Sequence, residues 1–275
     1  MAVGCVLTTG AGLVLAKCSA RDQLDASAEA QSAKDAEQGY IHASIRMKPY
    51  SSYVPPYLTF SKARLTPREV TGIERGEYSD LDVMKNGVKA ESFFLGVGGQ
   101  GGLGQNYFVD LVSDSSSMIT VTDLKPVDVD CRASKMMAAL DTPSEGLSSI
   151  AGVTFVLREN KGLNGGLISD SEDPNWGKPF FEHHTIVLGG GADAQTLQLT
   201  GVAPPGNRCT WKVRAEFTTD DGERHQAVLN EKPLTTEAGP GKGANTQHLA
   251  VDVGKVIKWA CDHGELTSSR CRGVQ

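Results

Sequence analysis

The sequence lacks the residue patterns that mark common enzymes and metal centres. It has no H-E-x-x-H pair, no G-x-S-x-G turn and no Walker lysine, which argues against zinc peptidases, α/β-hydrolases and P-loop nucleotidases. Its cysteines form no C-x-x-C pair and no zinc-type cluster with histidine. We therefore predict no catalytic residue, no cofactor and no metal site, and a protein that is not an enzyme.

A positive charge excess is also missing. The 275 residues include 27 Lys and Arg against 33 Asp and Glu, which gives a net charge of -6. Nucleic-acid-binding domains usually carry a basic surface, so we predict no nucleic acid among the partners. The hydrophobic share of 39% is sufficient for one sizeable core and argues against global disorder.

No strongly apolar run reaches the ~20 residues that a membrane-spanning helix needs. Residues 2–16, AVGCVLTTGAGLVLA, carry no charge, but as a helix they would span only about 22 Å. They also lack the basic n-region of a signal peptide. The alternatives are a transmembrane helix or signal-type segment with a truncated start, and a helix packed in the core. We favour the first, with residues 1–18 contacting the cytoplasmic membrane.

The remaining chain divides into three segments by composition. Residues 19–39 are rich in Ala, Asp, Glu, Gln and Ser, which predicts a solvated helical stalk or linker, or alternatively a coiled-coil segment. Residues 40–265 are predicted to form a single β-rich domain. Residues 266–275 are expected to be a C-terminal tail. A short helix is predicted over 66–77, because Thr66 and Glu69 have capping-box spacing.

Period-two alternation is the strongest structural signal. It runs through residues 118–131 and slips near Lys125–Pro126, which predicts a bulge or an edge position. Residues 208–230 place Trp211 and Phe217 on one face and carry an Asp-Gly hairpin turn at 221–222. Further strands are predicted at 40–47, 91–98, 106–113, 153–159, 184–191 and 195–203, and residues 237–247 are predicted to be a flexible loop. The fold class is therefore all-β: an antiparallel β-sandwich, immunoglobulin-like in architecture, with an N-terminal helix and a few short helices.

A glycine-rich segment, GVGGQGGLGQN at 96–106, matches the dinucleotide-binding spacing G-x-G-x-x-G. That chemistry needs a strand before the glycines and a helix after them. Here both flanks have strand patterns, so we predict a long, mobile connection between two strands and no nucleotide site.

Two polar segments could carry a metal. Glu182, His183 and His184 are consecutive. Adjacent residues of a strand face opposite sides of a sheet, so the two histidines cannot easily bind one ion. Asp170, Glu172 and Asp173 do not meet the EF-hand pattern. The predictions are exposed histidines and a solvated acidic loop, with Trp176 folded onto one end of the sandwich.

The cysteines of the domain form an even set. Cys131, Cys209, Cys261 and Cys271 can pair in three ways, and in a cytosolic protein they would be free thiols. Because Cys131 ends one predicted strand and Cys209 begins another, we favour 131–209 with 261–271. A bridge between residues 131 and 209 would contribute roughly 3–4 kcal/mol in the chain-entropy model.

Three segments follow one another along the chain: NYFVDLVSDSSSMITVTDLKPVDVDC (106–131), EDPNWGKPFFEHHTIVLGGG (172–191) and CTWKVRAEFTTDDGERHQAVLN (209–230). Together they resemble a family of actinobacterial membrane-anchored proteins with an extracytoplasmic all-β domain. The resemblance covers roughly residues 100–235. It places Cys131 and Cys209 on the two cysteine positions of the family pattern, which supports their pairing. It implies no activity, because the family carries no assigned catalytic residues.

These features together predict a protein of the cell membrane with its β-domain outside the cytoplasm. We expect the domain to act by binding or scaffolding at the cell envelope, with another envelope protein as its partner. One alternative is an extracytoplasmic hydrolase that uses loops at one end of the sandwich. The other is a soluble cytosolic protein.

Overall fold

The fold is known from a computed structural model, and its chain contacts separate residues 1–39 from a compact unit of residues 40–275. The structure describes residues 40–48, 57–61, 65–75, 77, 87–95, 100–141, 152–158, 165–170, 172–240, 247–252, 255–261 and 271–274. For residues 57, 88–95, 100–102, 141, 247–252, 255–261 and 271–274 the description covers the backbone alone. The predicted anchor (1–18) and stalk (19–39) lie outside the described residues.

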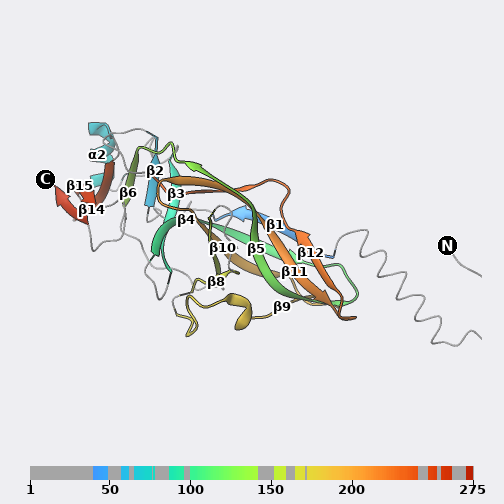
Figure 1. Cartoon of the computed structure of the whole chain (residues 1–275). Coiled ribbons are helices and arrows are strands. Elements are labelled where there is room, and N and C mark those ends of the chain that lie inside the picture. Colours follow the sequence, from blue (N-terminus) through green and yellow to red (C-terminus); the bar gives the residue numbers. More distant parts are fainter. Residues whose placement is uncertain are drawn as a thin grey trace, which may run out of the picture. The chain divides into compact units, whose positions relative to one another are not determined.

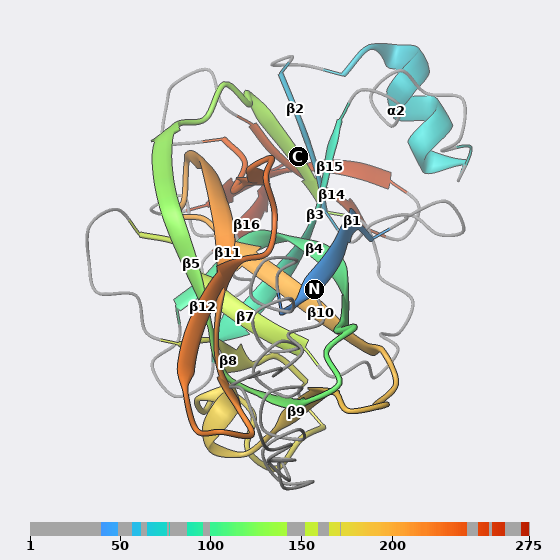
Figure 2. The same ribbon diagram turned by 90° about the vertical axis from the view of Figure 1, so that its right-hand side faces the viewer.

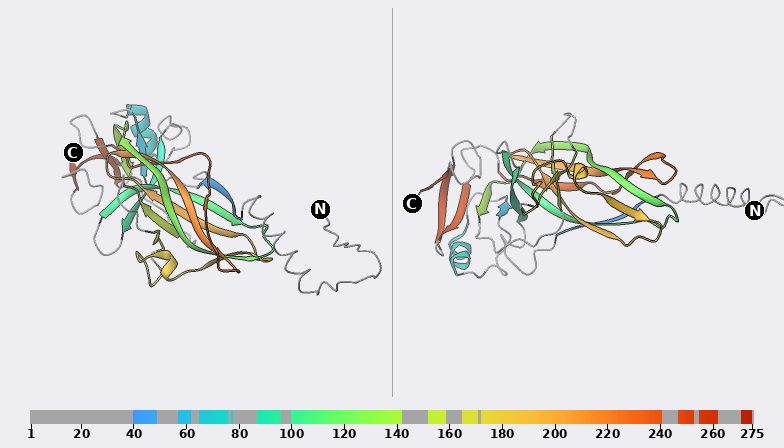
Figure 3. Two further views of the ribbon diagram at one scale, coloured as in Figure 1. Left: turned by 45° about the vertical axis from the view of Figure 1, so that its right-hand side comes forward. Right: turned by 90° about the horizontal axis from the view of Figure 1, so that it is seen from below.

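Strands dominate the described part of the chain, and they form two sheets (Figure 1). The larger sheet has eleven strands in the order β16-β15-β14-β6-β2-β3-β4-β10-β7-β8, with β1 paired to β4. These strands are β1 (His42–Met47), β2 (Tyr57–Phe60), β3 (Val88–Leu95), β4 (Gln100–Val112), β6 (Ala138–Asp141), β7 (Gly152–Val156), β8 (Leu167–Ile168), β10 (Gln195–Val202), β14 (Gln247–Asp252), β15 (Lys255–Cys261) and β16 (Cys271–Val274). Figure 3 shows the strands β14 and β15, which belong to one end of this order, in red.

The smaller sheet has five strands in the order β12-β11-β5-β9, with β13 paired to β11. They are β5 (Met118–Ala133), β9 (Ile186–Gly189), β11 (Asn207–Thr219), β12 (Arg224–Val228) and β13 (Leu234–Glu237). The hairpin between β11 and β12 turns at Asp221–Gly222 as predicted, with Gly222 at a φ of 85°, a conformation that suits glycine.

The hydrophobic core lies between the five-stranded sheet and strands β4, β7 and β10 of the larger one. Figure 2 shows β5, β11 and β12 as one layer beside β4, β7 and β10. Trp211 of β11 is fully buried at the centre, where it makes edge-to-face contacts with Tyr107 of β4 and Phe155 of β7. Alternate residues of β11 are buried from Cys209 to Thr219, which confirms the inward face predicted from Trp211 and Phe217. An all-β sandwich is therefore confirmed.

Strand β5 keeps one face in the core through two irregularities of its ladder with β11. The pairing shifts once between Phe217 and Glu216 and again between Lys212 and Thr210. At each shift β5 contains one extra residue, which is the definition of a β-bulge. Each bulge moves the buried set by one position, so the residues that face the core are Ile119, Val121, Leu124, Pro126, Val129 and Cys131.

The predicted slip in β5 is confirmed, but the bulges flank Pro126 instead of lying at it. Pro126 itself stays in register with Val213. Strand β9 pairs only with residues 118–121 of β5, so Pro126 lies on a stretch with one neighbour among the described strands. A residue without a backbone N–H is tolerated there.

The helix predicted over 66–77 forms as α2 (Pro67–Glu74). Thr66 and Glu69 make the predicted capping box: the Thr66 side chain accepts from the Glu69 N–H, and the Glu69 carboxylate accepts from the Thr66 N–H at 2.8 Å. A short 3-10 helix, η1 (Phe180–Glu182), is the other described helix. No helix in the described ranges is long and apolar enough to cross a membrane.

Several predicted boundaries and pairings differ from the structure. Strands β7 and β6 pair in parallel with β10 and β14, so the large sheet is mixed and not purely antiparallel. Residues 271–274, expected in a tail, form β16 beside β15. Strand β13 ends at Glu237, and residues 237–240 are buried, so these residues are not part of the flexible loop predicted over 237–247, of which residues 241–246 lie outside the described part. Strands as short as β13 and β16 are too short to show a recognisable alternation. They are strands because they pair with neighbouring strands.

Candidate functional site

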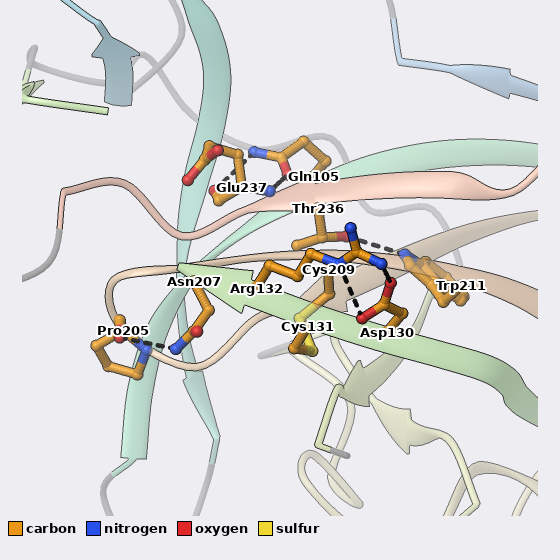
Figure 4. Close-up of a disulfide and its surroundings, with 10 residues drawn as sticks. All are labelled: Gln105, Asp130, Cys131, Arg132, Pro205, Asn207, Cys209, Trp211, Thr236 and Glu237. Atoms are coloured by element: carbon orange, nitrogen blue, oxygen red, sulfur yellow. Dashed lines mark hydrogen bonds and ion pairs between the residues drawn. A yellow bond between two sulfur atoms is a disulfide. The ribbon is translucent and has the colours of Figure 1, made fainter. Parts of the chain in front are cut away.

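A disulfide joins Cys131 of β5 to Cys209 of β11 (Figure 4). The two residues are direct partners in the β5–β11 register, and their Cα atoms are 4.0 Å apart. The bridge therefore links neighbouring strands within the five-stranded sheet and does not join the two sheets. The pairing agrees with the one favoured from the sequence. Cys209 is fully buried.

The ladder between β11 and β13 continues next to this bridge, with Cys209 opposite Thr236. In an antiparallel pair, the backbone groups of alternate residues point toward the neighbouring strand and those between them point away. The N–H of Ala238 donates to the carbonyl of Asn207, so the even-numbered residues here face β11. Thr235 and Glu237 consequently direct their backbone groups to the other edge of β13.

Two side chains of β4 bind that other edge in the manner of a strand. The Gln105 amide donates from Nε2 to the Glu237 carbonyl at 3.2 Å and accepts from the Glu237 N–H. The Tyr107 hydroxyl donates to the Thr235 carbonyl and accepts from the Thr235 N–H at 3.1 Å. We call these four residues the β4–β13 tie. It connects the two sheets and satisfies backbone groups that are removed from water.

Tyr107 and Trp211 are fixed by the same region. Burial raises the pKa of Tyr107 to about 12, so its hydroxyl keeps the proton that it donates. The Trp211 Nε1–H donates to the Thr236 hydroxyl at 3.0 Å. Gly201 of β10 leaves the space for this arrangement, since a Cβ at that position would lie 2.5 Å from the Thr236 hydroxyl and 2.7 Å from the Trp211 ring.

Glu237 is a buried acid at the end of the tie. It is 1% exposed, and its Oε1 accepts from the Gly239 N–H at 3.1 Å, while Oε2 has no hydrogen-bond partner. Burial raises the pKa of this carboxyl above its ordinary value, against the opposing effects of Ser134, the Gly239 N–H and Arg208. The groups that shift its pKa are a serine, a backbone N–H and an arginine, with no second acid among them, and we assign the carboxyl no catalytic role.

The glycine-rich segment does not lead into a helix. Strand β3 ends at Leu95, which is paired with Gln100 at the start of β4, and the two strands are antiparallel. The connection between two strands is as predicted. The long loop is not, because residues 100–106 belong to β4. Residues 96–99 lie outside the described residues, so the mobility predicted there stays a prediction.

The acidic and aromatic segment forms a turn-rich loop, residues 170–184, held by its own hydrogen bonds. The Asp170 carboxylate accepts from the Glu172 N–H, and the Asp173 carboxylate accepts from the Asn175 N–H at 2.7 Å. The other oxygen of Asp173 lies 3.0 Å from Nε2 of His184. Asp173 therefore holds a local turn at Asn175 and connects it to the end of the loop at His184, which is a structural use of the carboxylate.

The aromatic residues of this loop are distributed differently from the prediction. Phe180 is buried against the core and stacks on the His184 ring at 4.6 Å between centroids. Trp176, predicted to fold onto the sandwich, is 40% exposed. The residue that closes the end of the sandwich is Phe180, because η1 directs it inward. His183 is exposed as predicted.

The metal-binding alternatives find no support in the described part of the chain, where no three His, Cys, Asp or Glu side chains gather into a cation site. The predicted cysteine pair 261–271 has its backbone described but not its side chains, so this bridge stays a prediction.

Comparison with known proteins does not assign the chain to a family. No family model, no curated protein and no solved structure matches it. The resemblance to actinobacterial membrane-anchored proteins is left without a test.

Proposed function

We propose that the protein is exported, that its N-terminal segment holds it at the cytoplasmic membrane, and that its β-sandwich binds another envelope protein. The observation that carries this proposal is the Cys131–Cys209 bridge. Disulfides persist in oxidising compartments and are rare in the cytosol. The bridge supports a location outside the cytoplasm over the soluble cytosolic alternative.

The loop 170–184 is the surface through which we propose that the domain binds. Its hydrogen bonds fix the backbone before any partner arrives, and a preorganised loop loses less entropy on binding. It presents Trp176, which is 40% exposed. Tryptophan is enriched among the residues that dominate the energy of protein interfaces.

The hydrolase alternative would use the Asp173–His184 pair of this loop. A hydrolytic triad also needs a hydroxyl or thiol hydrogen-bonded to the imidazole. Among the described residues, the hydrogen bond of the His184 ring is to Asp173, and no nucleophile completes the set. We therefore favour binding over hydrolysis.

Trapping thiols in living cells tests the location. Cells are quenched with acid, free thiols are alkylated with a bulky maleimide, and the labelled cysteines are read from peptides. We expect Cys131 and Cys209 to react only after reduction. A Cys131→Ser variant is the control, since it exposes the single thiol of Cys209. Labelling of both cysteines before reduction would overturn the proposed export.

Site-specific photo-crosslinking tests the binding surface. A photoreactive residue replaces Trp176 in the loop or, as the control, Gln226 on β12, which is also exposed. We expect one discrete adduct from position 176 in intact cells and none of the same size from position 226. The adduct must disappear when excess purified domain is added. Equal adducts from both positions, or none from position 176, would contradict the proposal.

A further inference from the structure

The C-terminal strands place two cysteines opposite each other. Strands β15 and β16 are antiparallel, with the register Lys258↔Val274, Trp259↔Gly273, Ala260↔Arg272 and Cys261↔Cys271. Cys261 is the last residue of β15 and Cys271 is the first residue of β16. They form the final pair of the ladder, next to the segment that connects the two strands.

This placement meets the distance requirement of a disulfide. Directly opposed residues of an antiparallel pair have Cα atoms about 4.5–5.5 Å apart and lie on the same face of the sheet. A disulfide needs Cα atoms closer than about 7 Å. The Cys131–Cys209 bridge shows the same relation in this chain, since its residues are also direct partners in an antiparallel register.

The other two pairings of the four domain cysteines are excluded by the first bridge. Cys131 and Cys209 are already bonded to each other, so neither is available to Cys261 or Cys271. Of the cysteines in the described strands, only these two are left to pair, and the register brings them together.

We infer that Cys261 and Cys271 form a second disulfide, which fastens the terminal strand β16 to β15. Two thiols each lose a proton, a sulfur–sulfur bond forms between them, and two electrons pass to an oxidant of the thiol–disulfide oxidoreductase class. This inference rests on the proposed export, because the oxidising compartment supplies that oxidant. Since β16 is at the end of the strand order and has one neighbour among the described strands, the bridge would hold it by a covalent bond as well as by its ladder.

Peptide mapping of the full-length protein, isolated without reductant from the cells that make it, tests the inference. Free thiols are blocked with N-ethylmaleimide in denaturant before digestion with trypsin. Cleavage after Lys258 and Arg270 separates Cys261, in peptide 259–270, from Cys271, in the dipeptide 271–272. We expect these two peptides to be linked until they are reduced. Peptide 209–212, which contains Cys209, reports the first bridge in the same digest.

Single variants make the result specific. Cys271→Ser should leave Cys261 labelled by N-ethylmaleimide and keep the 131–209 link, and Cys261→Ser should do the same for Cys271. Labelling of both residues in the natural sequence, with the 131–209 link intact, would overturn this inference and leave the proposed export standing. Labelling of all four would overturn both, and a link between Cys131 and Cys261 or Cys271 would overturn the pairing.

Discussion

Gln105 and Tyr107 act where a neighbouring strand would otherwise be needed. Each side chain offers one donor and one acceptor, and each binds both backbone groups of one residue of β13. A buried backbone group without a partner costs about 1–3 kcal/mol. The two residues also lie in the buried face of β4, so their apolar parts contribute to the core while their polar ends complete the hydrogen bonding of β13.

Replacing Tyr107 with phenylalanine should destabilise the domain. The ring would still pack on Trp211, but the N–H and carbonyl of Thr235 would lose their partner. We expect the free energy of unfolding to fall by about 1–3 kcal/mol, as measured by urea denaturation. Tyr40→Phe is the control, because the Tyr40 ring packs on Phe217 and His225 and its hydroxyl has no part in the β4–β13 tie. Equal losses in the two variants would contradict the role of the Tyr107 hydroxyl.

Glu237 should give the domain a stability that falls as pH rises. Its folded-state pKa is raised above 4.5 by burial, so the folded state holds this proton more tightly than the unfolded state does. The stabilisation is complete below the unfolded pKa and is lost as pH rises through the folded pKa. Glu237→Gln removes the titration, so we expect a flatter curve of urea midpoint against pH between about pH 4 and pH 8.

Glu216 provides the control of opposite sign. The hydrogen bond from Lys125 to Glu216 lowers the pKa of that carboxyl. Its contribution is present above the ordinary pKa and is lost as pH falls, so Glu216→Gln should change the acid limb alone. A Glu237→Gln protein with an unchanged pH profile would show that the buried carboxyl does not titrate in this range.

Residue-scale prediction from sequence succeeded where burial follows alternation and failed where it does not. Trp211 was placed in the core correctly, because its neighbours alternate with period two. Gln105 was interpreted as the end of a glycine-rich loop, since nothing in its local sequence shows that Glu237, 132 residues away, needs a partner. Trp176 was misplaced because apolar size alone cannot distinguish it from Phe180.

At the scale of elements, β5 follows the surface of β11 by means of its two bulges. The second contains Asp128, whose φ of 52° is in the left-handed region. Aspartate adopts this region more readily than most residues, but glycine has no steric penalty there. The ion pair of Asp128 with Lys212, at 3.4 Å on the surface, contributes little.

Substitutions at Asp128 should therefore reverse the usual preferences of a strand. We expect Asp128→Gly to be neutral or to raise the free energy of unfolding by up to about 1 kcal/mol, and Asp128→Val to lower it by about 1–2 kcal/mol. The same pair of changes at Asp130, in the same strand, is the control, and there valine should be the better residue. Thermal or urea midpoints of the four variants test this prediction. The same ranking of glycine and valine at both positions would contradict a left-handed conformation of residue 128.

The sequence of β5 predicts that its alternation is interrupted, but not at which residues the bulges lie. The spacing from Val121 to Leu124 is three residues, which already breaks a period of two. Proline suggested a single irregularity at residue 126, whereas the partner strand defines two, on either side of it. A bulge is a property of two strands, so one strand's sequence shows only that the phase changes.

For the whole molecule, the Cys131–Cys209 bridge closes a segment of 78 residues. In the chain-entropy model, closing a loop of this length contributes about 4.5 kcal/mol by restricting the unfolded chain, somewhat more than the value expected above. We expect the double variant Cys131→Ala, Cys209→Ala to lose about that much stability in urea denaturation without reductant. In reductant, the natural sequence and the double variant should be about equally stable. If the natural sequence stays as stable in reductant as without it, this bridge does not contribute to stability.

The class of the fold was predictable, and the partition of strands into sheets was not. Regular alternation with turn signals indicates an all-β sandwich before any contact is known. The parallel neighbours β7–β10 and β6–β14 join segments that are far apart in sequence, and no local pattern encodes which strands become neighbours. The proposed binding surface depends on the same long-range information, because the exposure of Trp176 follows from where its loop meets the sandwich.

The covered edge of β13 has a consequence for self-association. An open strand edge presents unpaired N–H and carbonyl groups that can template the addition of a strand from another molecule, which is a route to aggregation. Along β13 those groups at Thr235 and Glu237 are already occupied within the molecule. A second copy therefore finds no free backbone groups at these two residues, and the five-stranded sheet cannot grow along this part of β13.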